Sequence, residues 1–421
     1  MSLEFKQNLE KYAEVLVKVG LNIQPGQRLL IGSPVFGIYG TPIELAPLVR
    51  LITSKAYQAG ARLVDALWND DQMKLIRFQK APRDSFDEFP EWRAKAVYET
   101  ASSGDAMLNF FAQDPELLKN QDPELVGIFH TTNWTHIGPT LGLTAKNATN
   151  WCVATAPVDG WVNKVFPALS PGEGKARFWD TIFEICRVKQ ADPIAAWEAH
   201  LAELSGRVDY LDHKKYTALK YSAPGTDLTV GLPKEHVWHS GRMTSQNGID
   251  FTANIPTEET FTLPHKNKID GVVSSTRPLE YGGSLIEDFT LKFSEGRVVE
   301  IAAKKNENIL RSLIETDEGA SRLGEVALVP NSSPISQTGM LFSNILLDEN
   351  ASNHFALGTA YKFSVQNGET MSDDDFAAIG GNQSLVHVDF MIGSGEMDVD
   401  GLTQHGSAEP VMRGGEWAFD V

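Results

Sequence analysis

The first 70 residues contain a strand, a helix and a second strand in that order. The short, mostly apolar runs Arg28–Ile31 and Arg62–Leu67 follow the turn signals Pro25–Gly26 and Gly60, which is typical of strands. Between them, Thr41–Glu44 has the pattern of a capping box with proline at the first helical position, and it predicts a helix that ends near Gln58. Strands joined through a helix normally lie parallel in one sheet. The chain is therefore expected to begin with a parallel α/β sheet.

Elements of the same kind continue to about residue 213. Further helices and strands are expected at residues 3–19 (helix), Ala106–Phe111 (strand), near Trp151–Ala154 (strand), and near 175–188 and 193–205 (helices). This alternation predicts an α/β N-terminal domain with a mainly parallel sheet over residues 1–213.

The pattern changes beyond that point. Short runs in which polar and apolar residues alternate, such as Asp227–Val230 and Phe289–Phe293, are separated by turns. Ser294–Arg297 is typical of a hairpin turn in which Gly296 supplies a positive φ, and one helix is expected near 305–316. Residues 214–421 are therefore predicted to form a mostly β (α+β) C-terminal domain.

The charge balance restricts the partners. The chain has 421 residues, long enough for two domains, and its 55 acidic and 37 basic residues give a net charge of −18. Nucleic-acid binding needs clustered Lys and Arg, so no nucleic-acid partner is expected, whereas cationic groups such as free amines and metal ions are attracted. No run reaches 18 apolar residues and the N-terminus has no apolar signal segment. We therefore expect a cytoplasmic protein without a membrane partner.

The sequence lacks the common motifs of nucleotide-cofactor and protease sites. Gly172–Ala176 lacks the first glycine and the hydroxyl of a phosphate loop, so no nucleotide cofactor is expected. There is no His-Glu-x-x-His sequence, which excludes a single zinc on one helix. His236 and His239 compete as a metal pair. Their spacing suits a helix, but Pro233 and the turn Ser240–Gly241 leave a helix little room.

Metal-ligand side chains gather in the last third of the chain. They form four clusters: Glu258 with Glu259, Glu325, Glu349 with His354, and His387 with Asp389. Ser384–Phe390 alternates as a strand does, so that His387 and Asp389 face one side about 7 Å apart. Such a pair can bind one ion or two neighbouring ions.

Each cluster also has an ordinary interpretation. Adjacent glutamates are usually solvated, and a lone histidine between apolar runs, such as His354, is usually a core residue with a hydrogen-bond partner. Glu325 heads an apolar strand, where an ionised carboxylate is costly unless it is paired or bound to a metal. The four clusters together favour Zn²⁺, Co²⁺ or Mn²⁺, because the ligands are carboxylates and imidazoles without a thiolate. So many ligands suit two ions that share a carboxylate and a hydroxide, an arrangement that activates water for hydrolysis.

At these residues the chain resembles the thermophilic-type metallo-aminopeptidases, family M29, which include aminopeptidases T, S and II. The resemblance covers essentially the whole length and rests on the following segments: Val19–Gln27, Asn254–Glu259, Thr316–Ala320, Leu323–Leu328, Asp348–His354 and His387–Asp389. It implies two divalent ions per chain and a homodimer. The implied ligands are Glu259, Glu325, Glu349, His354, His387 and Asp389, with Glu325 as the bridge. A register slip of one residue would exchange Glu259 for Glu258.

The resulting prediction is a metal-dependent aminopeptidase that releases N-terminal amino acids from peptides with a free N-terminus. A water activated by two metal ions would attack the scissile carbonyl. Glu258 is the expected general base, and Tyr361, which matches a family tyrosine, would hydrogen-bond the oxyanion. Two alternatives remain: another dinuclear amidase or hydrolase, and a metal-stabilised binding protein without catalysis. A phosphoesterase is disfavoured because no arginine lies within the clusters.

Overall fold

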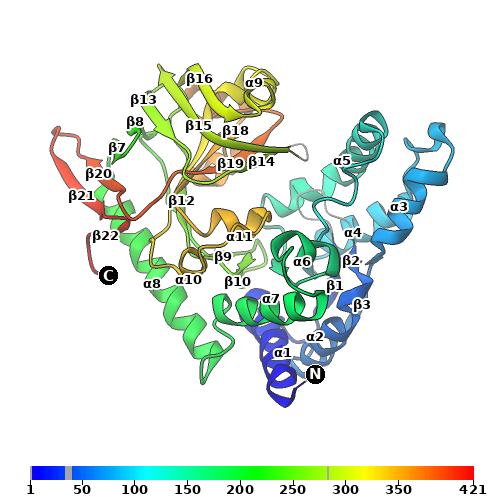
Figure 1. The fold of residues 1–421 in the computed structure, drawn as a ribbon. Coiled ribbons are helices and arrows are strands. Elements are labelled where there is room, and N and C mark those ends of the chain that lie inside the picture. The colour runs from blue at the N-terminus through cyan, green and yellow to red at the C-terminus, as the bar shows by residue number, and fades with distance from the viewer. Residues whose placement is uncertain (1, 34–39, 282–283) are drawn as a thin grey trace. The chain divides into compact units, whose positions relative to one another are not determined.

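The computed structural model describes residues 2–33, 40–281 and 284–421 (Figure 1). The chain divides into two compact units. The first comprises Met1–His200 and Arg242–Pro256, and the second comprises Leu201–Gly241 and Thr257–Val421. Helix α8 (Pro193–Lys214) contains the first change of unit. The boundary expected near residue 213 lies near the end of this helix and stays a prediction.

The first unit is built on a parallel sheet with strand order β11-β6-β5-β1-β3. Its strands are β1 (Arg28–Ile31), β3 (Leu63–Ala66), β5 (Ala106–Phe111), β6 (Trp151–Thr155) and β11 (Asn254–Ile255). β5 and β6 are buried at every residue, as expected for inner strands of a parallel sheet. β1 pairs with β3 in parallel, which confirms the predicted strand–helix–strand unit.

The remaining elements of this unit are mostly helices. They are α1 (Leu3–Val15), a π-helical turn (Leu16–Gly20), α2 (Ala46–Gln58), α3 (Asp71–Lys80), α4 (Glu91–Ser102), α5 (Pro123–Thr144), α6 (Asp159–Val165) and α7 (Pro171–Ile185), with 3-10 turns at Ile43–Leu45 and Arg83–Ser85. Two small sheets pair β2 (Thr41–Pro42) with β4 (Trp68–Asn69) and β9 (Arg242–Thr244) with β10 (Asp250–Thr252).

The start of α2 differs from the prediction. Thr41 does not cap a helix, because its backbone N–H donates to the carbonyl of Leu67 at 2.7 Å and the residue belongs to β2. A 3-10 turn, Ile43–Leu45, then leads into α2. Pairing between strands therefore takes the backbone N–H that would have donated to the Glu44 carboxylate in a capping box.

The second unit contains two antiparallel sheets. The nine-stranded sheet consists of β7 (Ala218–Ala223), β8 (Thr226–Gly231), β13 (Ile269–Ser274), β14 (Leu279–Tyr281), β15 (Ser284–Ser294), β16 (Arg297–Lys305), β20 (Asp398–Leu402), β21 (Ala408–Arg413) and β22 (Glu416–Trp417). The four-stranded sheet has the order β12 (Thr260–Thr262), β17 (Leu323–Leu328), β18 (His354–Gly358), β19 (His387–Met391). The unit also contains α9 (Glu307–Ile314), α10 (Pro334–Gln337), α11 (Ile345–Glu349), α12 (Asp373–Ala378) and 3-10 turns at Gly319–Ser321, Lys362–Ser364 and Gly368–Thr370.

The predicted hairpin turn is confirmed between β15 and β16. Glu295 and Gly296 both have positive φ, 48° and 79°. This is the backbone of a type I′ turn, whose twist matches that of the flanking strands.

The core of the second unit lies between its two sheets. The ring centroids of Tyr221 and Phe355 are 4.9 Å apart, and those of Phe289 and Phe390 are 5.6 Å apart, so strands of the larger sheet pack directly on β18 and β19. One face of the four-stranded sheet is therefore buried in this core.

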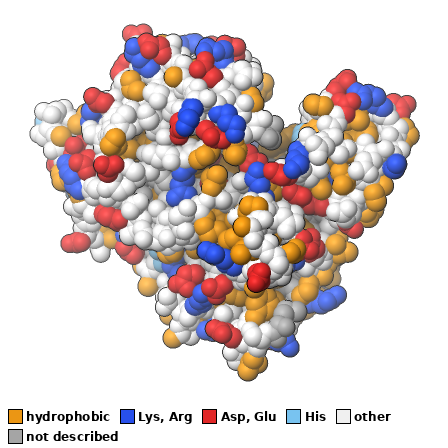
Figure 2. Space-filling view, in the orientation of Figure 1, with side chains coloured by type: hydrophobic (Ala, Val, Ile, Leu, Met, Phe, Trp, Pro, Cys, Tyr) orange, Lys and Arg blue, Asp and Glu red, His pale blue; other side chains and the backbone are white. Residues whose placement is uncertain are grey.

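The surface is charged with both signs. In the face shown in Figure 2, acidic and basic side chains are interspersed. Within the described part of the chain, no helix is both long and apolar enough to cross a membrane.

Candidate metal centre

The other face of the four-stranded sheet carries four of the predicted ligands, Glu325, His354, His387 and Asp389. Along β18 and β19, Phe355 and Phe390 point into the core, and the residues that alternate with them point to the opposite face. Glu325 of β17 is paired with Ala356 of β18, which is paired with Asp389 of β19. Strand β18 thus lies between the two strands that carry the carboxylates, and the small methyl group of Ala356 leaves space above the sheet.

A bulge in β17 turns Glu325 to this face. The register shifts between Leu323 and Glu325, and Leu323 and Val326, three residues apart, both lie in the core. Gly324 occupies the bulge, where a Cβ would lie 2.2 Å from the carbonyl oxygen of Thr359. Only glycine fits so close to another backbone.

Glu325 lies between two imidazoles. Its Oε1 is 3.5 Å from Nε2 of His354, and its Oε2 is 3.7 Å from Nε2 of His387. Glu259 Oε2 lies 3.3 Å from His354 Nε2, and Asp389 Oδ1 lies 3.5 Å from His387 Nε2. The described residues therefore form two groups of three possible ligands, with all ligand atoms of a group within 4.8 Å, and both groups contain Glu325.

Both imidazoles are oriented by backbone carbonyls. His354 Nδ1 lies 3.0 Å from the carbonyl oxygen of Ser352, and His387 Nδ1 lies 2.8 Å from that of Thr359. A carbonyl can only accept, so each Nδ1 carries the hydrogen and each Nε2 faces the carboxylates. Carbonyl partners of this kind fix the tautomer and ring orientation of metal-bound histidines.

The separations across the site fit a bound metal ion. At 3.3–3.7 Å, the Nε2–oxygen distances exceed the roughly 2.7–2.9 Å of a charge-assisted hydrogen bond. Two ligands on one tetrahedral ion, each about 2.0–2.2 Å from it, are about 3.4 Å apart. Asp389 Oδ1 also has no hydrogen-bond partner among the described residues, although it is buried. The donor set and its spacing therefore suit divalent cations.

Burial makes the charges of these side chains costly. It raises the pKa of Glu325, although the proximity of His354 acts in the opposite direction. Burial lowers the pKa of His387, but the negative charges of Asp389 and Glu325 outweigh it and raise the pKa to about 9. A cation between these groups would relieve the repulsion between the carboxylates.

Glu349 and Glu258 lie beside these two groups. Glu349 is the last residue of α11, and burial raises its pKa, followed by the charges of Glu259 and Asp389. Asn350 links the two: its Oδ1 accepts from the backbone N–H of Glu258 at 2.7 Å, and its Nδ2 lies 3.4 Å from Glu349 Oε1. Glu349 therefore lies close to the ligand groups without belonging to either.

The adjacent glutamates Glu258 and Glu259 point to different neighbours. Glu259 reaches the imidazole of His354. Glu258 is only 3% exposed, and its charge acts on Arg207, whose pKa is lowered by burial and raised by Glu203 and Glu258. Of the two, the structure places Glu259 at the ligand group.

Tyr361 borders the His387 half of the centre. Its ring lies 4.9 Å from the imidazole of His387 and stacks on Phe363 at 5.1 Å. Burial raises the pKa of Tyr361 well above its ordinary value, and the charges of Glu325 and Asp389 add to the shift. The phenol therefore keeps its proton and can act as a donor.

The competing histidine pair lies outside both groups. His236 Nδ1 lies 2.7 Å from the carbonyl of Pro233, and His239 Nε2 lies 2.9 Å from that of Phe363. Burial lowers the pKa of both imidazoles. Each ring is thus placed by a backbone carbonyl.

Two supporting residues were not singled out from the sequence. Gly324 interrupts an apolar strand, and such a glycine indicates a bulge, so this signal was available. Asn350 is fully buried beside Glu349, but nothing in the sequence indicates that it contacts Glu258.

Comparison with known proteins gives matches over nearly the full length. A family model described as thermophilic metalloprotease (M29) matches residues 5–417. Aminopeptidase 2 of Geobacillus stearothermophilus is 45% identical, over 99% of this chain and 99% of its own. Aminopeptidase T of Thermus thermophilus is 42% identical, over 98% and 99%. The solved structure of wild-type AmpT from Thermus thermophilus matches with a TM-score of 0.92 at 41% identity, covering 99% of this chain and 100% of that chain.

Proposed function

The chain belongs to the thermophilic metalloprotease family M29, and from this premise we propose that it releases N-terminal amino acids from peptides with a centre of two divalent metal ions. Its activity is that of a metal-dependent aminopeptidase, a hydrolase of peptide bonds. The number of ions and the role of each residue are what the proposal adds.

One observation carries the two-ion proposal: the oxygens of Glu325 face different imidazoles, at 3.5 and 3.7 Å. A carboxylate in this position can bridge two ions. The proposed ligands are Glu259, Glu325 and His354 for one ion and Glu325, His387 and Asp389 for the other, with Glu349 completing the set. Zn²⁺, Co²⁺ and Mn²⁺ all suit these ligands.

The proposed mechanism assigns a task to each part of the centre. Bound divalent ions would lower the pKa of water and polarise the scissile carbonyl. Glu258 is the proposed general base that accepts the proton of the attacking water. Tyr361 donates a hydrogen bond to the oxygen on which negative charge develops. The surrounding carboxylates would attract the protonated N-terminal amine, so we expect a preference for substrates with a free N-terminus.

Metal replacement with matched substrates tests the activity. The protein is stripped with a chelator, Zn²⁺, Co²⁺ or Mn²⁺ is restored singly, and aminoacyl arylamides with free and blocked amines are compared. We expect hydrolysis only of the free-amine substrate and only after metal is restored. Equal cleavage of both substrates would contradict an aminopeptidase.

The count of ions is tested by equilibrium dialysis followed by elemental analysis. We expect two ions per chain in the wild type and a lower count in Glu325→Gln. A single ion per chain in the wild type would refute the shared carboxylate.

The cellular context is also a proposal. We propose a cytoplasmic protein, and we propose a homodimer because of the family resemblance. Light scattering on the purified protein tests the dimer, because it should give twice the mass of one chain.

A further inference from the structure

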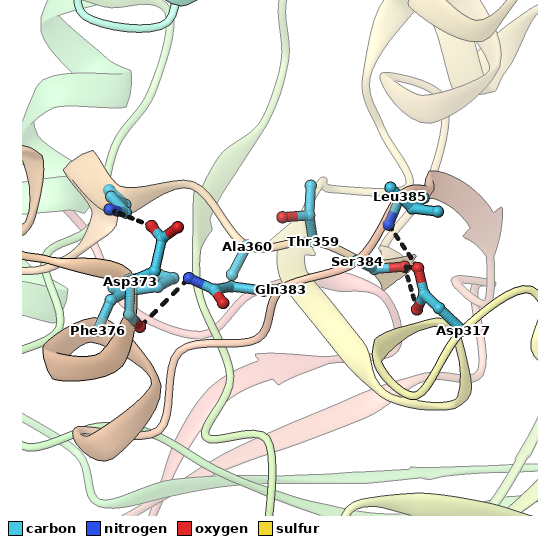
Figure 3. Close-up of a pocket in the computed structure, with 9 residues that line it drawn as sticks. Asp317, Thr359, Ala360, Asp373, Phe376, Gln383, Ser384 and Leu385 are labelled. Atoms are coloured by element: carbon cyan, nitrogen blue, oxygen red, sulfur yellow. Dashed lines mark hydrogen bonds and ion pairs between the residues drawn. The ribbon is translucent and has the colours of Figure 1, made fainter.

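A polar turn holds the segment that leads into β19. The Asp317 carboxylate accepts from Ser384 Oγ at 2.8 Å and from the backbone N–H of Leu385 at 2.6 Å (Figure 3). It also accepts from the backbone N–H of Ala320 at 2.8 Å, which closes its own turn. Thr316–Ala320 is one of the segments of the family resemblance, and the proposed chemistry gives it no role.

The turn and the segment are packed backbone to backbone. A Cβ on Gly319 would lie 1.8 Å from the carbonyl oxygen of Gln383. Asn382 Nδ2 donates to the carbonyls of Gly319 at 2.9 Å and Gly358 at 2.6 Å. The segment is therefore held between the turn on one side and the end of β18 on the other.

This segment determines the position of His387. Leu385, held by Asp317, is two residues before His387 on the same strand path. The backbone N–H of Thr359 donates to the carbonyl of Val386 at 2.8 Å, and the carbonyl of Thr359 accepts from His387 Nδ1 at 2.8 Å. A shift of residues 384–386 would move His387 and its carbonyl partner together.

The other half of the centre has separate supports. His354 is held by the carbonyl of Ser352, and Glu259 follows the backbone that Asn350 holds at Glu258. Among the described residues, none of these contacts involves Asp317.

We propose that Asp317 is a positioning residue that sets the metal affinity of the His387–Asp389 half of the centre. The inference rests on the proposed two-ion function. A carboxylate suits the task because it only accepts, and the groups around it, the N–H of Leu385, the N–H of Ala320 and the hydroxyl of Ser384, can all donate. An amide in its place would turn a donor towards one of them.

Asp317→Asn and a matched control test the proposal. Asp375→Asn is the control, because Asp375 also accepts from a serine, Ser372, at 2.7 Å, but that serine is the N-cap of α12. Zn²⁺ binding is measured by competition with a chromophoric chelator. We expect the wild type and Asp375→Asn to bind two ions. In Asp317→Asn one ion should keep its affinity and the other should weaken by about 10-fold or more.

Combination with ligand variants identifies the affected half. Asp317→Asn added to His387→Ala should cause no further loss of Zn²⁺ affinity, whereas added to His354→Ala it should weaken the remaining ion. Ser384→Ala, which removes one donor, should weaken the same ion less and serves if Asp317→Asn does not fold.

The outcomes separate the inference from the proposed function. Unchanged affinity for both ions in Asp317→Asn, or equal weakening of both, would overturn the role of Asp317 alone. A wild type that binds a single ion would overturn the two-ion function and the inference with it.

Discussion

Replacing Glu325 by glutamine should remove most of the stabilisation that metal gives to the second unit. The substitution keeps the shape of the side chain but replaces one carboxylate oxygen, facing either His354 or His387, by an NH₂ donor. The shared ligand is lost, and both ions bind more weakly.

The magnitude follows from linkage. Free metal at 100 times its dissociation constant stabilises the folded state by about 2.7 kcal/mol per ion, hence about 5 kcal/mol for two. For a domain of about 150–250 residues, 1 kcal/mol shifts the Tm by about 2–4 °C. The wild-type unit should therefore gain about 10–20 °C, and Glu325→Gln should gain less than about a third of that.

Without metal, the expected effect of Glu325→Gln on the Tm has the opposite sign. Because burial raises the pKa of Glu325, the stability associated with its protonated form is lost as pH rises through the raised pKa. A neutral glutamine avoids that loss, so metal-free Glu325→Gln should unfold at or above the Tm of metal-free wild type at pH 7.

Thermal unfolding with and without Zn²⁺ provides the assay. Glu307→Gln on α9 is the control, since Glu307 pairs with Arg311 on its own helix, and its gain from metal should equal that of the wild type. An equal gain in Glu325→Gln would refute the shared carboxylate.

Three further predictions concern the same centre. Tyr361→Phe should lower kcat by about 10²–10³-fold and leave Zn²⁺ content unchanged, as steady-state kinetics and elemental analysis will show; an unaltered kcat removes the phenol from the mechanism. Zn²⁺ affinity should rise about tenfold per pH unit from pH 7 to 9, because the pKa of His387 is raised to about 9 and metal needs its neutral imidazole; a flat pH profile argues against His387 as a ligand. Asn350→Ala should destabilise the protein by about 1–3 kcal/mol, since the buried N–H of Glu258 loses its acceptor, and urea unfolding measures this; a change below about 0.5 kcal/mol contradicts the role of Asn350.

Much of the fold was accessible from local patterns. Residues 106–111 and 28–31 form strands with the predicted bounds, and the turn at Ser294–Arg297 is where the sequence predicts it. These elements are specified by local apolar runs and by turn chemistry. β11 was not accessible, because Asn254–Ile255 returns to the first sheet by pairing with β6, about 100 residues earlier in the chain. Short-range periodicity carries no information on such a partner.

The site, like the fold, has features that the sequence indicates and features that it does not. His387 and Asp389 share a face because of the two-residue period of a strand, which the sequence displays. The preference for Glu259 over Glu258 at His354 depends on how one loop is held by Asn350, which follows α11 and is distant in sequence. The carbonyls of Ser352 and Thr359 orient the imidazoles. Because every residue has a backbone carbonyl, the residue types in the sequence do not indicate these contacts.

The two faces of β17, β18 and β19 have a consequence for how sequences of this kind can change length. Loss or gain of one residue within β19 would exchange the faces of the residues beyond it, so that Phe390 would enter the buried metal centre and Asp389 would enter the core. One such event would damage folding and chemistry together, and no single substitution would repair both. We therefore expect length variation among relatives to be confined to the connections between these strands, and strand lengths to be inherited intact.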